Sequence, residues 1–179
     1  PKLVNGSPRV INALDVVEKG LQTEIDGGAI IAVGAAEHPE HTMHDPMDNA
    51  LYAIKFDDLW VMHVGDLGYG LNADELAPFV GHCDVLLAIT GDSNTIPLPD
   101  LDFMIEHLKP NWVVPMHYFL PPFGKGMAPV GKFLDRRRRD VVIYPKSTTI
   151  RLPTEIPGAN GGPAIIVLEP SGYELTAYR

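Results

Sequence analysis

Leu59-Trp60-Val61-Met62-His63-Val64-Gly65-Asp66 is an apolar run, typical of a buried strand, that ends at a glycine and a carboxylate. A second apolar run, Trp112-Val113-Val114-Pro115-Met116, ends in the same way at His117. A carboxylate and an imidazole can both bind a metal ion, and in open α/β sheets ligands usually bind at the carboxyl ends of the strands. The two segments therefore predict a site at one edge of a sheet, built from Asp66 and His117.

The segments on either side of these two runs predict an α/β fold with a mixed sheet. Before Leu59, strand patterns follow one another, which is typical of an antiparallel meander. After Leu59, strands alternate with helices, which indicates an α/β layer. The predicted strands are Leu21–Ile25, Ala29–Ala36, Asn49–Phe56, Leu59–Val64, Asp84–Thr90, Trp112–Met116, Val141–Tyr144, Thr148–Leu152, Ala164–Glu169 and Tyr173–Tyr178. A short helix is predicted from its cap at Asn72 through Phe79, and two more helices are predicted over Leu98–Leu108 and Val130–Arg139.

Length and composition restrict the class of protein. With 179 residues, 45% hydrophobic and 21% charged, the chain has the size and composition of one globular domain, and we expect a single domain over residues 1–179. The net charge of −9 disfavours nucleic acid and anionic membranes as partners. No apolar run approaches the ~18 residues that span a bilayer. The single cysteine, Cys83, fits a reducing compartment, so we expect a cytoplasmic protein.

Each candidate site residue also has a structural interpretation. Asp66 precedes a glycine-bearing turn, where its carboxylate could reach a cation or could instead accept hydrogen bonds from turn amides. His117 at a strand end could bind a metal or could serve only the structure. The loop with His38, His41 and His44 has the spacing His-x2-His-x2-His, which differs from the helical His pair at i and i+4.

The run Arg136–Arg139 predicts an exposed helix end, because positive charges there interact favourably with the helix dipole. A phosphate-binding role is the alternative. The sequence contains neither a glycine-rich phosphate loop nor a serine nucleophile elbow.

Taken together, the motifs resemble the metal-dependent hydrolases of the metallo-β-lactamase superfamily, and most closely the ascorbate-6-phosphate lactonase-like branch. The resemblance covers about residues 27–120. The strings that carry it are Asn49-Ala50-Leu51-Tyr52-Ala53-Ile54, Trp60-Val61-Met62-His63-Val64-Gly65-Asp66-Leu67-Gly68, Cys83-Asp84-Val85-Leu86-Leu87, Leu108-Lys109-Pro110 and Val114-Pro115-Met116-His117-Tyr118.

The resemblance implies a divalent metal cofactor, zinc or alternatively manganese, and a small-molecule substrate. It implies that Asp66 bridges two metal ions and is a catalytic residue, and that His117 binds the second metal. For the first metal it implies His38, with His44 as the alternate. The reaction implied is hydrolysis of an ester, lactone, amide or phosphoester by metal-activated water.

One departure from the family is large: the sequence contains no His-x-His-x-Asp-His, the segment that supplies most of the family's metal ligands. The chain therefore resembles the C-terminal half of an αββα sandwich, with a mixed sheet and helices on one face. We expect weak metal binding and little hydrolysis from this chain alone. The alternative is a non-catalytic binding domain in which Asp66 and His117 are structural.

A sheet with helices on one face leaves its other face apolar, and that face must be covered in solution. The resemblance implies that the covering layer is the family's N-terminal half. A second copy could cover the face instead through a two-fold contact, so we expect a homodimer or larger homo-oligomer.

Overall fold

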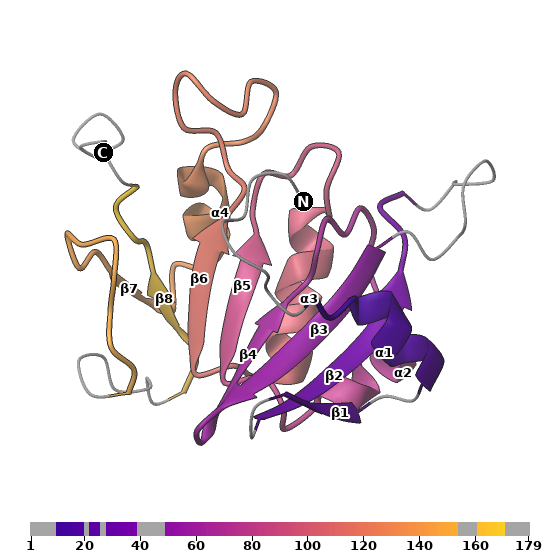
Figure 1. Cartoon of the computed structure of the whole chain (residues 1–179). Coiled ribbons are helices and arrows are strands. Elements are labelled where there is room, and N and C mark those ends of the chain that lie inside the picture. The colour runs from indigo at the N-terminus through magenta and orange to yellow at the C-terminus, as the bar shows by residue number, and fades with distance from the viewer. Residues whose placement is uncertain (1–9, 20–21, 26–27, 39–48, 154–160, 171–179) are drawn as a thin grey trace.

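The computed structural model describes residues 10–19, 22–25, 28–38, 49–153 and 161–170, and within them one sheet organises the fold (Figure 1). The sheet has eight strands in the order β1-β2-β3-β4-β5-β6-β8-β7. The strands are β1 Gln22–Ile25, β2 Gly28–Ala35, β3 Asn49–Phe56, β4 Leu59–His63, β5 Val85–Ile89, β6 Trp112–Met116, β7 Val141–Ile143 and β8 Ala164–Ile166. The helices are α1 Ala13–Lys19, α2 Ala73–Leu76, η1 (3₁₀) Ala77–Phe79, α3 Leu98–Leu108 and α4 Val130–Arg136.

The direction of pairing changes at β4. From β1 to β4 each neighbouring pair is antiparallel, as the meander pattern predicts. From β4 through β5 and β6 to β8 the pairs are parallel, and β7 pairs with β8 in parallel at the far edge. The carboxyl ends of β4, β5 and β6 therefore lie at one edge of the sheet.

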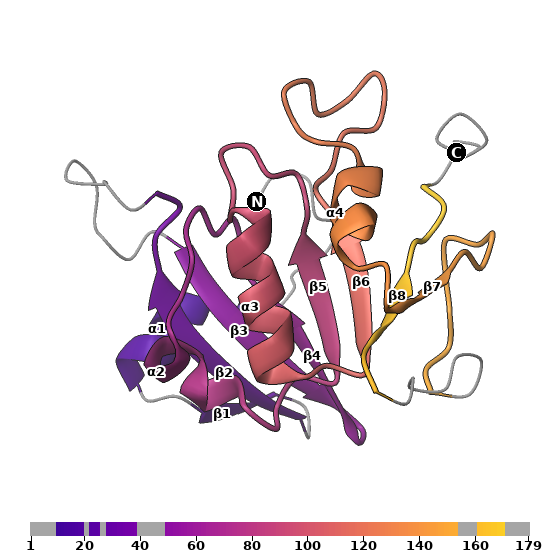
Figure 2. The ribbon, with the colours of Figure 1, turned by 180° about the vertical axis from the view of Figure 1, so that it is seen from behind.

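The larger core lies between the sheet and α2, α3 and α4, which cover the face seen in Figure 2. Side chains of successive strand residues point to opposite faces, so alternate residues enter this core. On β2 these are Ile31, Val33 and Ala35, which are buried in the core or packed against it. From the helices, α4 contributes the fully buried Phe133.

The opposite face carries α1 and two smaller clusters (Figure 1). Val16 of α1 packs with Ile30 and Ala32 of β2. Further along the sheet, the second cluster has Trp112 and Ile166 at its buried centre. Partly buried residues around it include Leu59, Val61, Leu87, Val114, Ile150 and Leu152.

Within the Arg136–Arg139 run, Arg137 is more buried than the sequence predicts, whereas the other three arginines are exposed. Arg137 is only 10% exposed and pairs with Asp102 and Glu106 of α3 at 3.6 Å, and with Asp140 at 2.6 Å. Arg136 also reaches Asp102, at 2.6 Å. The interpretation as a purely exposed helix end is therefore wrong for Arg137.

The predicted fold class is confirmed: the chain forms an α/β fold with a mixed sheet. α1 lies on the second face, so the prediction of helices on one face of the sheet does not hold for this segment, whose residue pattern predicts no definite element. The predicted strand Thr148–Leu152 is wrong, because this segment has no strand pairing and packs Ile150 and Leu152 on the second cluster instead. The predicted strand Tyr173–Tyr178 lies outside the described residues. Among the helices that the structure describes, none is long and apolar enough to cross a membrane.

Candidate functional site

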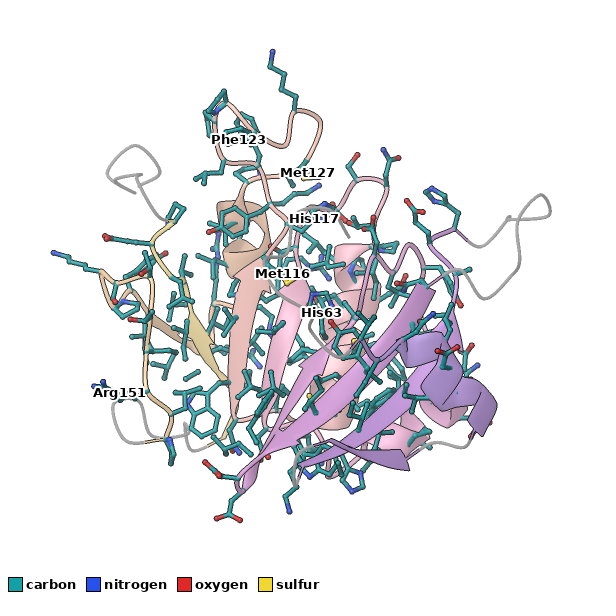
Figure 3. The ribbon with its side chains drawn as sticks, in the orientation of Figure 1. His63, Met116, His117, Phe123, Met127 and Arg151 are labelled. Atoms are coloured by element: carbon teal, nitrogen blue, oxygen red, sulfur yellow. The ribbon has the colours of Figure 1, made fainter. Side chains whose placement is uncertain are left out.

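Three loops leave the sheet at the edge where β4, β5 and β6 end. Asp66 lies three residues after β4, Asp92 three residues after β5, and His117 directly after β6. Figure 3 shows His117 just beyond the end of β6, with Met116 below it and His63 near the end of β4. The topology therefore brings the two predicted site residues Asp66 and His117 to the same edge of the sheet, where both are exposed.

Backbone hydrogen bonds join these loops to one another. The Ile96 N–H donates to the Leu67 carbonyl over 2.7 Å, which joins the loop after β5 to the loop after β4. The Ala128 N–H donates to the Gly91 carbonyl over 2.6 Å, which joins the loop after β6 to the loop after β5. These bonds give the edge a defined backbone, although its side chains reach solvent.

The end of β2 also reaches this edge, and it brings His38 there. A Cβ built on Gly68 would lie 1.5 Å from the Glu37 carbonyl oxygen and 3.4 Å from His38 Nδ1. The Ala36 N–H also donates to the Tyr69 hydroxyl over 3.4 Å. His38 thus lies beside the turn that carries Asp66, and its role as a metal ligand stays a prediction, while the alternate ligand His44 lies outside the described residues.

The donor chemistry of this edge fits a divalent cation only in part. Asp66, His117 and His38 supply the carboxylate and imidazole donors that zinc and similar ions use. Within the described part of the chain, however, no group of three or more His, Cys, Asp and Glu side chains could hold a metal ion. The described residues therefore do not form a complete metal site on their own.

Two residues that the sequence reasoning did not single out contact the Asp66 turn. Asn49, the first residue of β3, accepts a hydrogen bond from the Asp66 N–H, and His63 accepts one from the Gly65 N–H. Both residues lie in strings that carry the family resemblance, but nothing in the sequence marks their side chains as partners of this turn. Asn49 stands at a strand start, and a histidine within an apolar strand looks like an ordinary core residue.

Asp92, in the loop after β5, has a structural role in the described residues. Its carboxylate accepts hydrogen bonds from the Leu98 N–H at 2.9 Å and from Lys132 Nζ at 2.5 Å. Burial alone would raise the pKa of Asp92, but these bonds and the charge of Lys132 outweigh it and lower the pKa. Asp92 thus joins α4 to the start of α3.

His63 makes the stability of the protein depend on pH. Burial lowers the pKa of His63 below its ordinary value of 6.5, because burial disfavours the charged imidazolium. The unfolded chain takes up this proton at a pH of about 6.5, whereas the folded chain takes it up at a lower pH. The contribution of neutral His63 to the free energy of unfolding is therefore present above a pH of about 6.5. It is lost as the pH falls through the lower pKa of the folded state.

We expect the free energy of unfolding, measured with urea, to fall more steeply below a pH of about 6.5 in the unmodified protein than in His63→Asn. Asparagine does not titrate there, and its Oδ1 can replace Nδ1 as an acceptor. The other histidines are the same in both proteins, so the difference between the two curves isolates His63. Parallel curves would contradict the prediction.

Comparison with known proteins gives a family match over most of the chain. The family model described as "Beta-lactamase superfamily domain" matches residues 1–117. A UPF0173 metal-dependent hydrolase from Pyrococcus horikoshii is 29% identical over 124 residues, which are 69% of this chain and 55% of that protein. A second one, from Thermococcus kodakarensis, is 27% identical over 124 residues with the same shares. This chain thus spans about 55% of the length of these relatives.

A solved structure shows the same fold. The chain is similar to a protein from Thermotoga maritima that is named as a Zn-dependent hydrolase of the metallo-beta-lactamase superfamily. The TM-score is 0.62 at 21% identity, and the match covers 82% of this chain and 68% of that one. At this identity the likeness concerns the fold alone.

Proposed function

This chain belongs to the family of the beta-lactamase superfamily domain, and we propose on that basis that it forms part of a metal-dependent hydrolase. The observation that carries the proposal is the position of Asp66 and His117 at the same edge of the sheet, in the loops that follow β4 and β6. The names of the relatives from Pyrococcus and Thermococcus, both metal-dependent hydrolases, support the same reaction class.

In the proposed site, Asp66 and His117 each contribute a ligand and His38 approaches from the end of β2. Asp66 is the proposed catalytic residue. Zinc is the proposed ion, with manganese as the alternative, because carboxylate and imidazole donors suit both. A divalent ion of this kind supplies an activated water for attack on an ester, lactone, amide or phosphoester. A lactone or phosphoester would correspond to the ascorbate-6-phosphate lactonase-like branch.

The test is a calorimetric titration of the protein with Zn²⁺ and with Mn²⁺. We expect weak binding by the unmodified chain, and a further loss of affinity of roughly tenfold or more in both Asp66→Asn and His117→Gln, because each removes one ligand. Asp58→Asn is the matched control, since Asp58 is an exposed carboxylate at the opposite end of β4 and should leave the affinity unchanged.

Equal affinity in the unmodified protein, Asp66→Asn and His117→Gln would contradict the proposal. That result would favour the alternative, a non-catalytic binding domain in which both residues are structural. Generic ester and phosphodiester substrates complete the experiment, and we expect little turnover from this chain alone. Robust turnover that Asp66→Ala abolishes would support the function but would show that the absent His-x-His-x-Asp-His is dispensable.

We also propose that the chain forms a homodimer through the sheet face opposite α3. Leu59, Val61, Leu87 and Val114 form a partly buried apolar area on that face. A contact between two copies there should bury roughly 2,000 Å² or more, as in obligate dimers. A cytoplasmic location remains a prediction.

Analytical ultracentrifugation checks the dimer. We expect a dimer at micromolar concentration in the unmodified protein, and a shift toward monomer in Val61→Glu, which places a charge within the apolar area. Val80→Glu is the control, because Val80 is 50% exposed in the turn after η1, away from that face. A stable, folded monomer in the unmodified protein would refute the homodimer.

A further inference from the structure

The turn after β4 presents two consecutive backbone N–H groups to side chains. The antiparallel register of β3 and β4 pairs Tyr52 with His63, so the same register places Asn49 opposite Asp66. β3 thus begins where the turn of β4 ends. This position allows one short side chain from β3 to reach the backbone of the turn directly.

Asn49 uses both ends of its amide on this turn. Its Oδ1 accepts a hydrogen bond from the Asp66 N–H at 3.0 Å, and its Nδ2 donates to the Val64 carbonyl at 3.1 Å. Because an N–H needs an acceptor and a carbonyl needs a donor, these two partners also determine the orientation of the amide. Asn49 therefore connects the backbone before Gly65 with the backbone after it.

His63 holds the neighbouring N–H. Its Nδ1 accepts a hydrogen bond from the Gly65 N–H at 2.8 Å, so the ring proton must be on Nε2. The ring also stacks on Tyr52, with centroids 5.4 Å apart and an interplanar angle of 9°. The stack and the hydrogen bond together allow the ring little freedom to turn.

Gly65 leaves the space that this arrangement needs. Its φ of +63° lies in the left-handed region, which other residues rarely adopt. A Cβ at Gly65 would lie 2.0 Å from Asn49 Oδ1 and 2.9 Å from the Ala50 carbonyl oxygen. The Asn49 amide thus occupies the place of the missing side chain.

We propose that Asn49 and His63 are positioning residues that fix the direction of the Asp66 side chain at the carboxyl edge of the sheet. They act on two successive amides, those of Gly65 and Asp66, and so hold the backbone from which the carboxylate projects. A carboxylate on a held backbone loses less freedom when it binds a cation, which makes binding tighter. The expected effect on cation binding rests on the proposed function, whereas the expected effect on the backbone of the turn does not.

Amide hydrogen exchange, measured by NMR on the metal-free protein, tests the turn. Asn49→Ala should speed exchange of the Asp66 amide by roughly tenfold or more, and His63→Phe, which keeps a ring against Tyr52, should do the same for Gly65. The rescuing variant His63→Asn keeps an acceptor in the place of Nδ1 and should retain the protection of Gly65. Asn111→Ala is the control, because the Asn111 side chain bonds Asp84 at the start of β5.

Unchanged exchange at Asp66 and Gly65 in Asn49→Ala and His63→Phe would overturn the proposal. So would a loss of protection spread evenly over the sheet, because it would show general destabilisation. Should Asn49→Ala fail to fold, His63→Phe and its rescue by His63→Asn decide the same question at Gly65.

Calorimetry with Zn²⁺ then separates this inference from the proposed function. If both are correct, Asn49→Ala should bind roughly tenfold more weakly than the unmodified protein, and His63→Asn should bind equally well. A loss of binding in Asp66→Asn but not in Asn49→Ala would overturn the positioning role and leave the proposed function standing. No effect of Asp66→Asn, with the exchange results as expected, would overturn the proposed function while the turn is still held as described.

Discussion

Gly68→Ala should lower the free energy of unfolding by about 3 kcal/mol or more, a large share of the 5–15 kcal/mol that is typical of a protein. The cause is the close approach of two backbone segments. A Cβ at Gly68 would lie 1.5 Å from the Glu37 carbonyl oxygen and 2.7 Å from its carbon. Both atoms belong to the main chain, so no rotamer change can relieve the overlap, and the end of β2 must move away.

Urea unfolding followed by circular dichroism measures this loss. Gly131→Ala is the matched control, because nothing lies within 4 Å of a Cβ built there, in the first turn of α4. Alanine favours a helix over glycine, so this control should raise stability by up to ~1 kcal/mol. Equal stability of Gly68→Ala and the unmodified protein would show that Glu37 and His38 do not lie against the turn after β4.

Arg137→Ala should lower the free energy of unfolding by about 2–3 kcal/mol. The guanidinium pairs with three carboxylates, of which Asp140 is 11% exposed and Asp102 is 16% exposed. Removing the guanidinium takes this partner from the largely buried Asp140 carboxylate, which is the costly case, whereas Asp102 keeps its ion pair with Arg136. Glu106 is 72% exposed and adds little to the loss.

Arg138→Ala tests whether the loss of stability in Arg137→Ala comes from the buried position of Arg137 or only from the removal of one positive charge. Arg138 is 78% exposed and pairs with Asp135, itself 72% exposed, so its removal should change stability by less than ~0.5 kcal/mol. Urea unfolding of both variants at low and high salt gives the comparison. The loss in Arg137→Ala should persist in ~1 M salt, because buried pairs are screened much less than exposed ones. Equal losses in the two variants would mean that Arg137 does not join α4 to α3.

Local patterns were enough to predict the elements around the site. The helix Leu98–Leu108 has the predicted bounds, because a proline stands in its first turn and Lys109 caps its end in a left-handed conformation before Pro110. Its buried residues, Leu98, Leu101, Met104, Ile105 and Leu108, follow the helical period. The strand Trp112–Met116 was predicted with equal accuracy, and the strand order places Asp66 and His117 at one edge of the sheet.

What the sequence could not predict depends on contacts between distant residues. The β-branched residues of Thr148–Leu152 favour a strand locally, but packing on the second cluster decides their conformation. The partners of Arg137 come from another helix, and the position of Asn49 opposite Asp66 follows from the register of two strands. Local propensity carries no information about such pairings, so the residues that hold the Asp66 turn appear only in the structure.

The position of β8 between β6 and β7 has a consequence for how the chain folds during its synthesis. β7 is made before β8, yet in the described sheet it joins its neighbours through β8. Until residues 164–166 leave the ribosome, β7 has no strand to pair with and β6 is an open edge. An unpaired strand edge attracts other chains. A nascent chain that stalls before residues 164–166 are made is therefore open to aggregation at this edge, although α3 and α4 are already complete.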